Sequence, residues 1–274
     1  MFSDKYHAES ISVQQRKDVN FRDDLRIGLL QREFFVVYQP VVDVASRIVV
    51  SYEALVRWQH PIRGLVMPEA FIEKAERTGL ILLITADVLE QVCRKLKIGS
   101  RSRHQLPISV NLSAVCLATG TVPDAIRSVL QRFDVSPEKL ILEITETAPL
   151  EPFESVLVQL EELRAMDIKI VLDDFGAGYS SLANLGRYPL SGLKVDRSLL
   201  EDIPHDERPC LIVASVIDLV RRLGLSVVVE GVESERQLDW IRQFPDVLAQ
   251  GNLFGMPKRT VRRDSQRLPS TGGK

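Results

Sequence analysis

The sequence is poor in cysteine and has little excess of charge of either sign. Its three cysteines, Cys93, Cys116 and Cys210, are widely separated and form no Cys-x-x-Cys pair. This spacing argues against a disulfide framework or a zinc site, and we expect reduced thiols packed as small core residues in a cytoplasmic protein.

The sequence also lacks the long apolar run of roughly 18 residues that a membrane-spanning helix needs. Its first 18 residues are polar, unlike a secretory signal peptide. With 35 Lys and Arg against 37 Asp and Glu, the net charge is −2, so the basic excess of a dedicated nucleic-acid binder is missing. We therefore expect a soluble protein that has no membrane segment and binds no nucleic acid polymer.

What the sequence does contain is a long alternation of strand and helix patterns. A helix is expected at 22–33, followed by two strands at 34–41 and 48–57 whose short separation predicts an antiparallel hairpin. Further strands are expected at 107–112, 140–145, 169–174, 192–196, 226–231 and 246–250. Helices are expected at 68–78, 80–97, 122–133, 153–166, 180–186, 208–223 and 234–243.

This alternation indicates parallel strands joined by right-handed crossovers. About eight such units in about 240 residues favour an α/β fold of the closed (β/α)8 TIM-barrel type, with an open doubly wound sheet as the alternative. We expect a flexible lead-in at 1–20, one barrel domain at 21–258 and a basic, disordered tail at 259–274.

Side chains that carry oxygen stand at the ends of five apolar runs. They are Glu53, Asn111, Glu143, Asp173, Asp174 and Glu230. A carboxylate beside buried Ile, Leu and Val is costly unless its charge is compensated, and the carboxyl ends of barrel strands meet at the active site. We therefore expect a shared cation site. Oxygen ligands suit Mg²⁺ or Mn²⁺, and no histidine ends one of these runs, so zinc is not favoured.

Asp173 and Asp174 are neighbours, and neighbours in a regular strand point to opposite faces. They can converge only if the strand ends there, which Gly176 and Gly178 make plausible. One acid of such a pair could bridge two metal ions that clamp a phosphodiester and activate water, and Lys194 could hold that water or neutralise charge.

Each of these residues also has a simpler interpretation when it is taken alone. A strand-end acid commonly caps a helix, a lysine commonly forms a salt bridge, and Asn111 could hydrogen-bond a loop. Their coincidence on successive strands favours one site.

The residues lie in segments that resemble the EAL domain family, in the family's order. The segments are YQPVVD (38–43), EALVRWQHP (53–61), NLS (111–113), EITET (143–147), DDFGAGYSSL (173–182), KVD (194–196), EGVE (230–233) and QGNLFGMP (250–257). They extend over nearly the whole chain. The resemblance implies hydrolysis of the bacterial second messenger cyclic di-GMP to linear pGpG, which lowers cyclic di-GMP signalling in processes such as biofilm formation. It also implies a modified barrel whose first strand is antiparallel.

The resemblance further implies roles for individual residues. Two Mg²⁺ or Mn²⁺ ions would be held by Glu53, Asn111, Glu143, Asp173, Asp174 and Glu230. Lys194 and Gln250 would attend the water at the metals, with Glu230 as a possible base, while Gln39 and Arg57 would hold the nucleotide. Glu146 would anchor a mobile loop over 174–182, and the chain would form a homodimer through this region.

Two positions depart from the family pattern. Ala177 stands where the family usually has Thr, which removes a hydroxyl from the loop, and Asn252 stands where an aromatic residue is usual. Neither is an implied metal ligand. Two other functions stay open: a non-catalytic cyclic di-GMP receptor or protein-interaction module on the same fold, and a Mg²⁺-dependent barrel enzyme of the enolate type, which needs a Lys or His base.

Overall fold

Eight strands of the chain close into a barrel. The computed structural model describes residues 21–99, 105–145, 153–177 and 185–261. The strand order is β1-β9-β8-β7-β6-β5-β4-β2, and pairing between β1 and β2 closes the ring. The strands are β1 (Phe34–Asp43), β2 (Val49–His60), β4 (Ile108–Leu112), β5 (Leu140–Thr145), β6 (Lys169–Phe175), β7 (Gly192–Val195), β8 (Ser226–Val229) and β9 (Val247–Gln250).

Only the first strand runs against the others. β1 is antiparallel to β2 and to β9, whereas each of the other neighbouring pairs in the ring is parallel. The predicted modified barrel is confirmed, and the open sheet is excluded by the closing pair.

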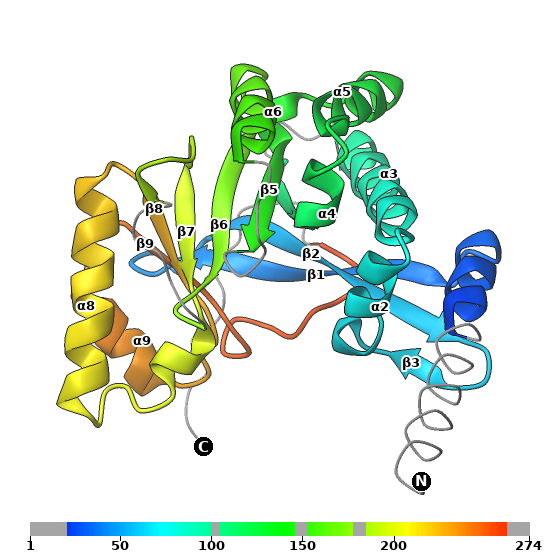
Figure 1. Cartoon of the computed structure of the whole chain (residues 1–274). Helices are drawn as coiled ribbons and strands as arrows, with labels where there is room; N and C mark the ends of the chain where they lie inside the picture. Colours follow the sequence, from blue (N-terminus) through cyan, green and yellow to red (C-terminus); the bar gives the residue numbers. More distant parts are fainter. Residues whose placement is uncertain (1–20, 100–104, 146–152, 178–184, 262–274) are drawn as a thin grey trace, which may run out of the picture.

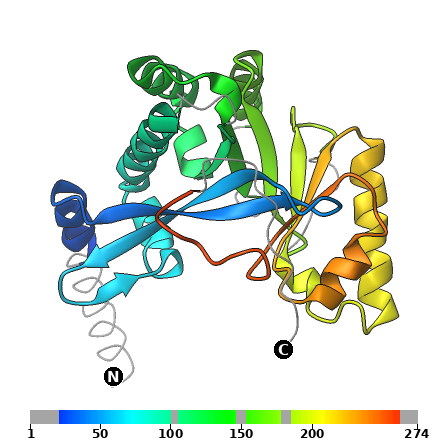
Figure 2. The same cartoon turned by 180° about the vertical axis from the view of Figure 1, so that it is seen from behind.

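Helices cover the outside of the barrel, with α3, α5, α6 and α8 along the strands (Figures 1 and 2). The helices are α2 (Ile72–Arg77), α3 (Ile81–Gly99), α4 (Ala114–Leu117), α5 (Val122–Phe133), α6 (Phe153–Ala165), α8 (Glu207–Arg222) and α9 (Glu235–Ile241), with 3₁₀ turns at Pro68–Ala70, Pro137–Lys139 and Arg197–Leu200. Residues 21–30 are also helical.

Most predicted elements are present, and the differences are local. The predicted helix at 68–78 is divided, because Phe71 has a non-helical φ of −131° between the 3₁₀ turn and α2. The short elements α4 and β3 (Gly64–Val66) were not predicted, since a few residues carry too little periodicity. The helix expected at 180–186 falls largely outside the described residues.

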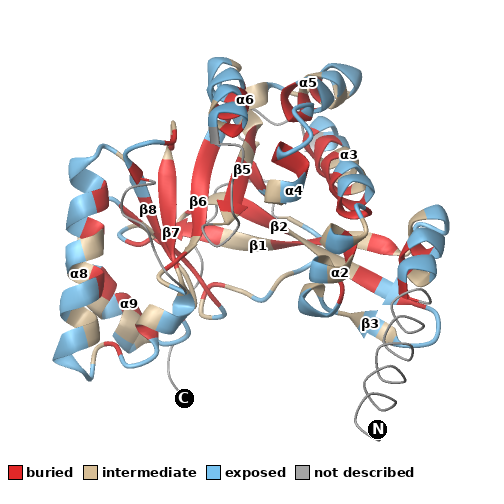
Figure 3. Ribbon diagram, viewed as in Figure 1, coloured by how far each residue is buried: buried red, intermediate tan, exposed pale blue. Residues whose placement is uncertain are grey.

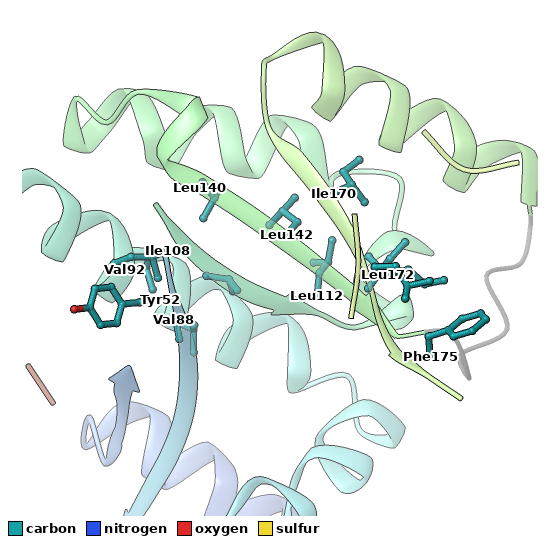
Figure 4. Close-up of a cluster of buried hydrophobic side chains, with 14 of the residues drawn as sticks. Tyr52, Val88, Val92, Ile108, Leu112, Leu140, Leu142, Ile170, Leu172 and Phe175 are labelled. Carbon is teal, nitrogen blue, oxygen red and sulfur yellow. The ribbon is translucent and has the colours of Figure 1, made fainter. Parts of the chain in front are cut away.

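The core lies mainly between the outward faces of the strands and the surrounding helices, where buried residues concentrate (Figure 3). On β5, Leu140, Leu142 and Ile144 are at most 1% exposed and share one face, while Glu143 takes the other. Leu142 and Ile170 lie on neighbouring strands within this apolar layer (Figure 4). Alternation along β5 therefore supplies the core with apolar side chains and turns Glu143 toward the barrel interior.

The β1–β2 hairpin extends beyond the ring toward α2 and β3 (Figure 1). There Trp58 is fully buried, stacks on Phe34 with ring centroids 5.3 Å apart, and contacts Phe71 edge-on. Its indole N–H donates to Glu33 at 2.8 Å. This aromatic cluster holds the part of β2 that extends beyond the ring, which carries Arg57, against the helices.

Helix α9 begins with a capping box that follows the segment carrying Glu230. Ser234 accepts from the backbone N–H of Gln237, and the Gln237 side chain accepts from Ser234. We expect Ser234→Ala to lower the free energy of unfolding by about 1 kcal/mol, because a first-turn N–H loses its partner. Urea unfolding measures this, and an unchanged midpoint would contradict it.

The three cysteines are free, as predicted: Cys93 and Cys116 are buried, and Cys210 is partly buried. Among the described residues, no helix combines the length and apolar character needed to cross a bilayer. The expected lead-in at 1–20 lies outside the described residues, and so does the expected tail beyond residue 261.

Candidate active site

Neighbouring strands are offset so that the predicted ligands on β2, β4, β5 and β6 reach one level of the barrel. Glu53 lies opposite Ser109, and Asn111, two residues further along β4, lies opposite Glu143. Asp173 in turn lies opposite the residue two positions beyond Glu143. A step of two residues keeps each side chain on the same face, and the tilt of barrel strands converts such steps into a level ring.

The second half of the ring follows the same rule. Lys194 on β7 lies opposite the residue two positions before Glu230. On β1, the residue two positions beyond Gln39 pairs with Gln250, and Gln39 itself pairs with Glu53. Residues spread over almost the entire chain therefore come together at one end of the barrel.

The adjacent acids converge by a different route from the one predicted. β6 does not end at Asp174 but continues to Phe175, and its register with β7 shifts between Leu172 and Phe175. Asp174 has a left-handed φ of +57°, and its backbone N–H donates to Asp173 Oδ1 at 2.9 Å. A bulge within the strand, rather than its end, turns Asp174 toward the site.

Carboxylate oxygens form two overlapping groups. One comprises Glu53, Glu143 and Asp173, and the other comprises Asp173, Asp174 and Glu230, with the ligand atoms of each group within 4.8 Å of one another. Asp173 belongs to both. Two hard divalent ions fit this donor set, because Mg²⁺ and Mn²⁺ prefer carboxylate and amide oxygens.

Lys194 lies at the centre of these acids. Its side chain is 2% exposed, and its Nζ forms ion pairs with Glu230 at 2.6 Å, Glu143 at 3.0 Å and Asp173 at 3.1 Å. A fourth ion pair joins it to Glu53 at 3.3 Å. The single ammonium therefore compensates part of a large excess of negative charge.

Two amides orient Glu53. Asn111 Nδ2 donates to Glu53 Oε1 at 2.9 Å, and Gln250 Nε2 donates to Glu53 Oε2 at 2.5 Å and to Gln39 Oε1 at 3.0 Å. Gln250 Oε1 is buried and has no hydrogen-bond partner among the residues that the structure describes. A buried acceptor of this kind is costly unless a donor reaches it, so it suits a site that admits a bound water.

The local charge environment shifts the pKa values of the acids in different directions. Burial opposes ionisation of Glu53, but the Lys194 ammonium and the two amide hydrogen bonds outweigh it and hold the pKa of Glu53 below its ordinary value. For Glu143, burial together with the charge of Glu53 dominates, and its pKa lies well above the ordinary value. Burial also raises the pKa of Asp173, although Lys194 opposes the shift.

The acids of the second group are harder to ionise than free carboxyls. Burial, only partly offset by Lys194, raises the pKa of Glu230 to about 8. Burial and the charge of Asp173 raise the pKa of Asp174 to about 6, with a contribution from Asp196. Crowded, buried carboxylates of this kind lack positive charge, which a divalent cation would supply.

The predicted nucleotide-binding residues flank this cluster. Gln39 Nε2 donates to the Gly255 carbonyl oxygen at 3.4 Å. Arg57 lies on the same face of β2 as Glu53, four residues or roughly 13 Å along the strand. Its guanidinium is partly buried and donates to the Val56 carbonyl oxygen at 2.8 Å.

The remaining predicted residues are placed only in part. Glu146 and most of the loop at 174–182 lie outside the described residues. Ala177 donates its backbone N–H to the Asp174 carbonyl oxygen at 3.1 Å, and Asn252 Nδ2 donates to Glu233 at 3.3 Å.

Two polar residues at the site were not predicted. Ser109 is 3% exposed and hydrogen-bonds Glu143, and Asp196 lies close enough to Asp174 to raise its pKa. Ser109 had a detectable signal, because it stands two residues before Asn111 in an apolar strand and so shares its face. Asp196 had a signal too, because it is an acid at the end of the predicted strand at 192–196; its side chain also caps a 3₁₀ turn.

Comparison with known proteins adds independent information. The family model described as "EAL domain" matches residues 22–257. The chain is 38% identical over 253 residues to the bifunctional diguanylate cyclase/cyclic di-GMP phosphodiesterase MucR of Pseudomonas aeruginosa, covering 92% of this chain and 37% of MucR. It is 37% identical over 254 residues to the cyclic di-GMP phosphodiesterase NbdA of the same organism, covering 92% of this chain and 32% of NbdA.

A solved structure described as "PaMucR Phosphodiesterase, c-di-GMP complex" is similar in fold and in sequence. Its TM-score is 0.81 at 40% identity, covering 87% of this chain and 97% of that one. The chain spans about a third of the length of MucR and of NbdA.

Proposed function

Because the chain belongs to the EAL domain family, we propose that it hydrolyses cyclic di-GMP to linear pGpG with the help of two divalent metal ions. The observation that carries this proposal is the complete ring of acids around Asp173, which belongs to both groups of oxygens. A chain that had become a non-catalytic receptor would be expected to have lost one of these ligands.

The proposed metal ligands are the residues of the two oxygen groups together with the amide oxygen of Asn111. They are Glu53, Asn111, Glu143, Asp173, Asp174 and Glu230. Two bound Mg²⁺ or Mn²⁺ ions would neutralise the phosphate oxygens and acidify the attacking water. Asp173 would serve both ions, and the bulge at Asp174 explains how adjacent residues can share them.

The chain's own groups would then direct the proton and the charge. Glu230, whose carboxylate belongs to the second oxygen group, is the proposed general base for the attacking water. Gln250 Oε1 can accept a hydrogen bond from the attacking water, since no other described donor reaches it. Lys194 can donate to the phosphate as negative charge develops on it.

Gln39 and Arg57 are the proposed nucleotide contacts. A guanidinium on the site's own face of β2 suits a phosphate, because its fork of N–H donors matches phosphate oxygens. We further propose that Glu146 anchors the loop at 174–182 and that the chain forms a homodimer through this region, both on the strength of the family resemblance. Light scattering at several protein concentrations tests the dimer.

The direct test is incubation of the purified chain with cyclic di-GMP and Mg²⁺ or Mn²⁺, followed by chromatography. We expect pGpG to accumulate in proportion to enzyme, and the reaction to stop when the metal is chelated. Tight nucleotide binding without product in either metal would contradict hydrolysis and would establish the receptor alternative.

Gly251 offers a test of how closely the segment that follows Gln250 must approach the segment that follows Glu230. A Cβ at Gly251 would clash with the backbone of Val232, whose N–H donates to the Gln250 carbonyl oxygen at 3.0 Å. We expect Gly251→Ala to displace Gln250 and Glu230 and to lower turnover roughly 100-fold. Steady-state kinetics measures the loss. Gly224→Ala is the control for backbone strain remote from the site, because a Cβ there meets no atom within 4 Å but alanine is disfavoured at its φ of +74°.

A further inference from the structure

The most unusual feature of the site is that one ammonium contacts carboxylates from β2, β5, β6 and the end of β8. Lys194 reaches every acid of the first oxygen group, Glu53, Glu143 and Asp173, and also Glu230 of the second. Four of the five carboxylates that would bind metal therefore form ion pairs with Lys194.

We propose that Lys194 is an internal counter-cation that competes with the divalent ions for these carboxylates and thereby sets the metal affinity of the site. In the metal-free site its role is one of positioning: it holds the acids together when metal is scarce and yields their oxygens when metal binds. The inference rests on the metal-binding part of the proposed function and is independent of the substrate.

The competition follows from distance and charge. An oxygen ligand lies about 2.0–2.1 Å from Mg²⁺. Lys194 Nζ lies 2.6 Å from Glu230 and 3.0 Å from Glu143. An ion bound to the same oxygens would be only a few ångströms from the ammonium, in a buried environment that screens the repulsion poorly. Metal binding therefore requires the side chain to withdraw from some of its partners.

The positions of the carboxylates around Lys194, called the carboxylate cage below, do not depend on the lysine alone, as Glu53 shows. Asn111 donates to its Oε1 and Gln250 to its Oε2, so two neutral donors hold this carboxylate in place. Ser109 does the same for Glu143. Ligands that keep such partners retain their geometry when Lys194 withdraws, so removing the ammonium abolishes the competition and leaves much of the carboxylate cage intact.

The test is calorimetric titration of Mn²⁺ into chelator-treated protein without nucleotide. We expect Lys194→Met, which keeps the apolar stem, to bind Mn²⁺ at least about tenfold more tightly than the natural chain. Lys194→Arg, which keeps the charge, should stay close to the natural affinity. Lys169→Met is the matched control, because Lys169 is exposed at the other end of the neighbouring strand β6.

Denaturant unfolding of the same variants gives a second readout. Without metal, Lys194→Met should unfold at a lower denaturant concentration than the natural chain. Saturating Mn²⁺ should raise the unfolding midpoint of Lys194→Met by more than it raises the midpoint of the natural chain. Equal or weaker Mn²⁺ binding by Lys194→Met would overturn the inference, because it would mean that the ammonium prepares the ligands for metal rather than competing with it.

Nitrogen NMR of the natural protein keeps the test valid if Lys194→Met does not fold. In ¹⁵N-lysine-labelled protein, the Lys194 ammonium resonance, assigned by its loss in Lys194→Arg, should shift as Mg²⁺ is added; an unchanged resonance at saturating Mg²⁺ would overturn the inference. Absence of pGpG in the hydrolysis assay would refute the proposed activity and leave these metal-binding results standing.

Discussion

Asp173→Asn should lower the rate of cyclic di-GMP hydrolysis by about 1,000-fold or more, since a metal clamp contributes several kcal/mol to the transition state. The substitution is nearly isosteric but removes the charge of the one residue that belongs to both oxygen groups. Calorimetry should show that both Mn²⁺ equivalents bind weakly. Asp174→Asn should affect mainly one equivalent, because Asp174 belongs to the second group alone.

Asp167→Asn is the matched control for this experiment. Asp167 lies two residues before the same strand, is exposed and has a left-handed φ of +64°, which Asn also tolerates. It should retain the natural rate and metal stoichiometry. If Asp173→Asn kept turnover within tenfold of the natural chain, the shared role of Asp173 would be wrong.

The second large effect is on the pH dependence of metal binding. The pKa of Glu230 is about 8, so at pH 6 this carboxyl is protonated and must release a proton before it can bind a cation. Glu230 alone should therefore lower the apparent Mn²⁺ affinity about 50-fold from pH 8 to pH 6, which is about 2.3 kcal/mol. Asp174, with a pKa of about 6, should add a loss of about twofold at pH 6 and more below it.

The stability of the chelator-treated protein should change with pH in the opposite direction. A carboxyl with a raised pKa binds its proton more tightly in the folded chain than in the unfolded one. Its contribution to the free energy of unfolding therefore falls as pH rises from about 4.5 toward about 8.

Thermal unfolding with and without Mn²⁺ at pH 6 and pH 8 measures both effects. The gain in melting temperature from Mn²⁺ should be larger at pH 8. Glu230→Gln should remove most of this pH dependence, whereas a metal affinity that is constant between pH 6 and pH 8 would show that Glu230 is already ionised at pH 6.

Most of the fold could be predicted because its signals are local. The helix at 122–133 and the strand at 140–145 have the predicted bounds, since each combines a clear periodicity with a proline or turn at its boundary. The division of the helix at 68–78 could not be predicted, because the non-helical conformation of Phe71 follows from burying that ring against Phe34 and Trp58.

The membership of the site was also readable from the sequence. A charged residue within or directly after a buried strand is costly and therefore conspicuous, and Glu53, Glu143 and Asp173 were identified as candidates on that basis. Their mutual distances were not readable, because they depend on strand pairing between segments far apart in the chain. The bulge at Asp174 depends on the offset between β6 and β7, which no local pattern reports.

The sequence by itself determined that oxygen ligands lie within or directly after successive strands of an α/β barrel, because alternation and the cost of buried charge are properties of short segments. Only the tertiary structure decided that Asp173 belongs to both oxygen groups and that one buried ammonium, Lys194, contacts four acids. The physical reason is that the offset between paired strands sets which side chains share a level, and that offset exists only once the barrel has closed.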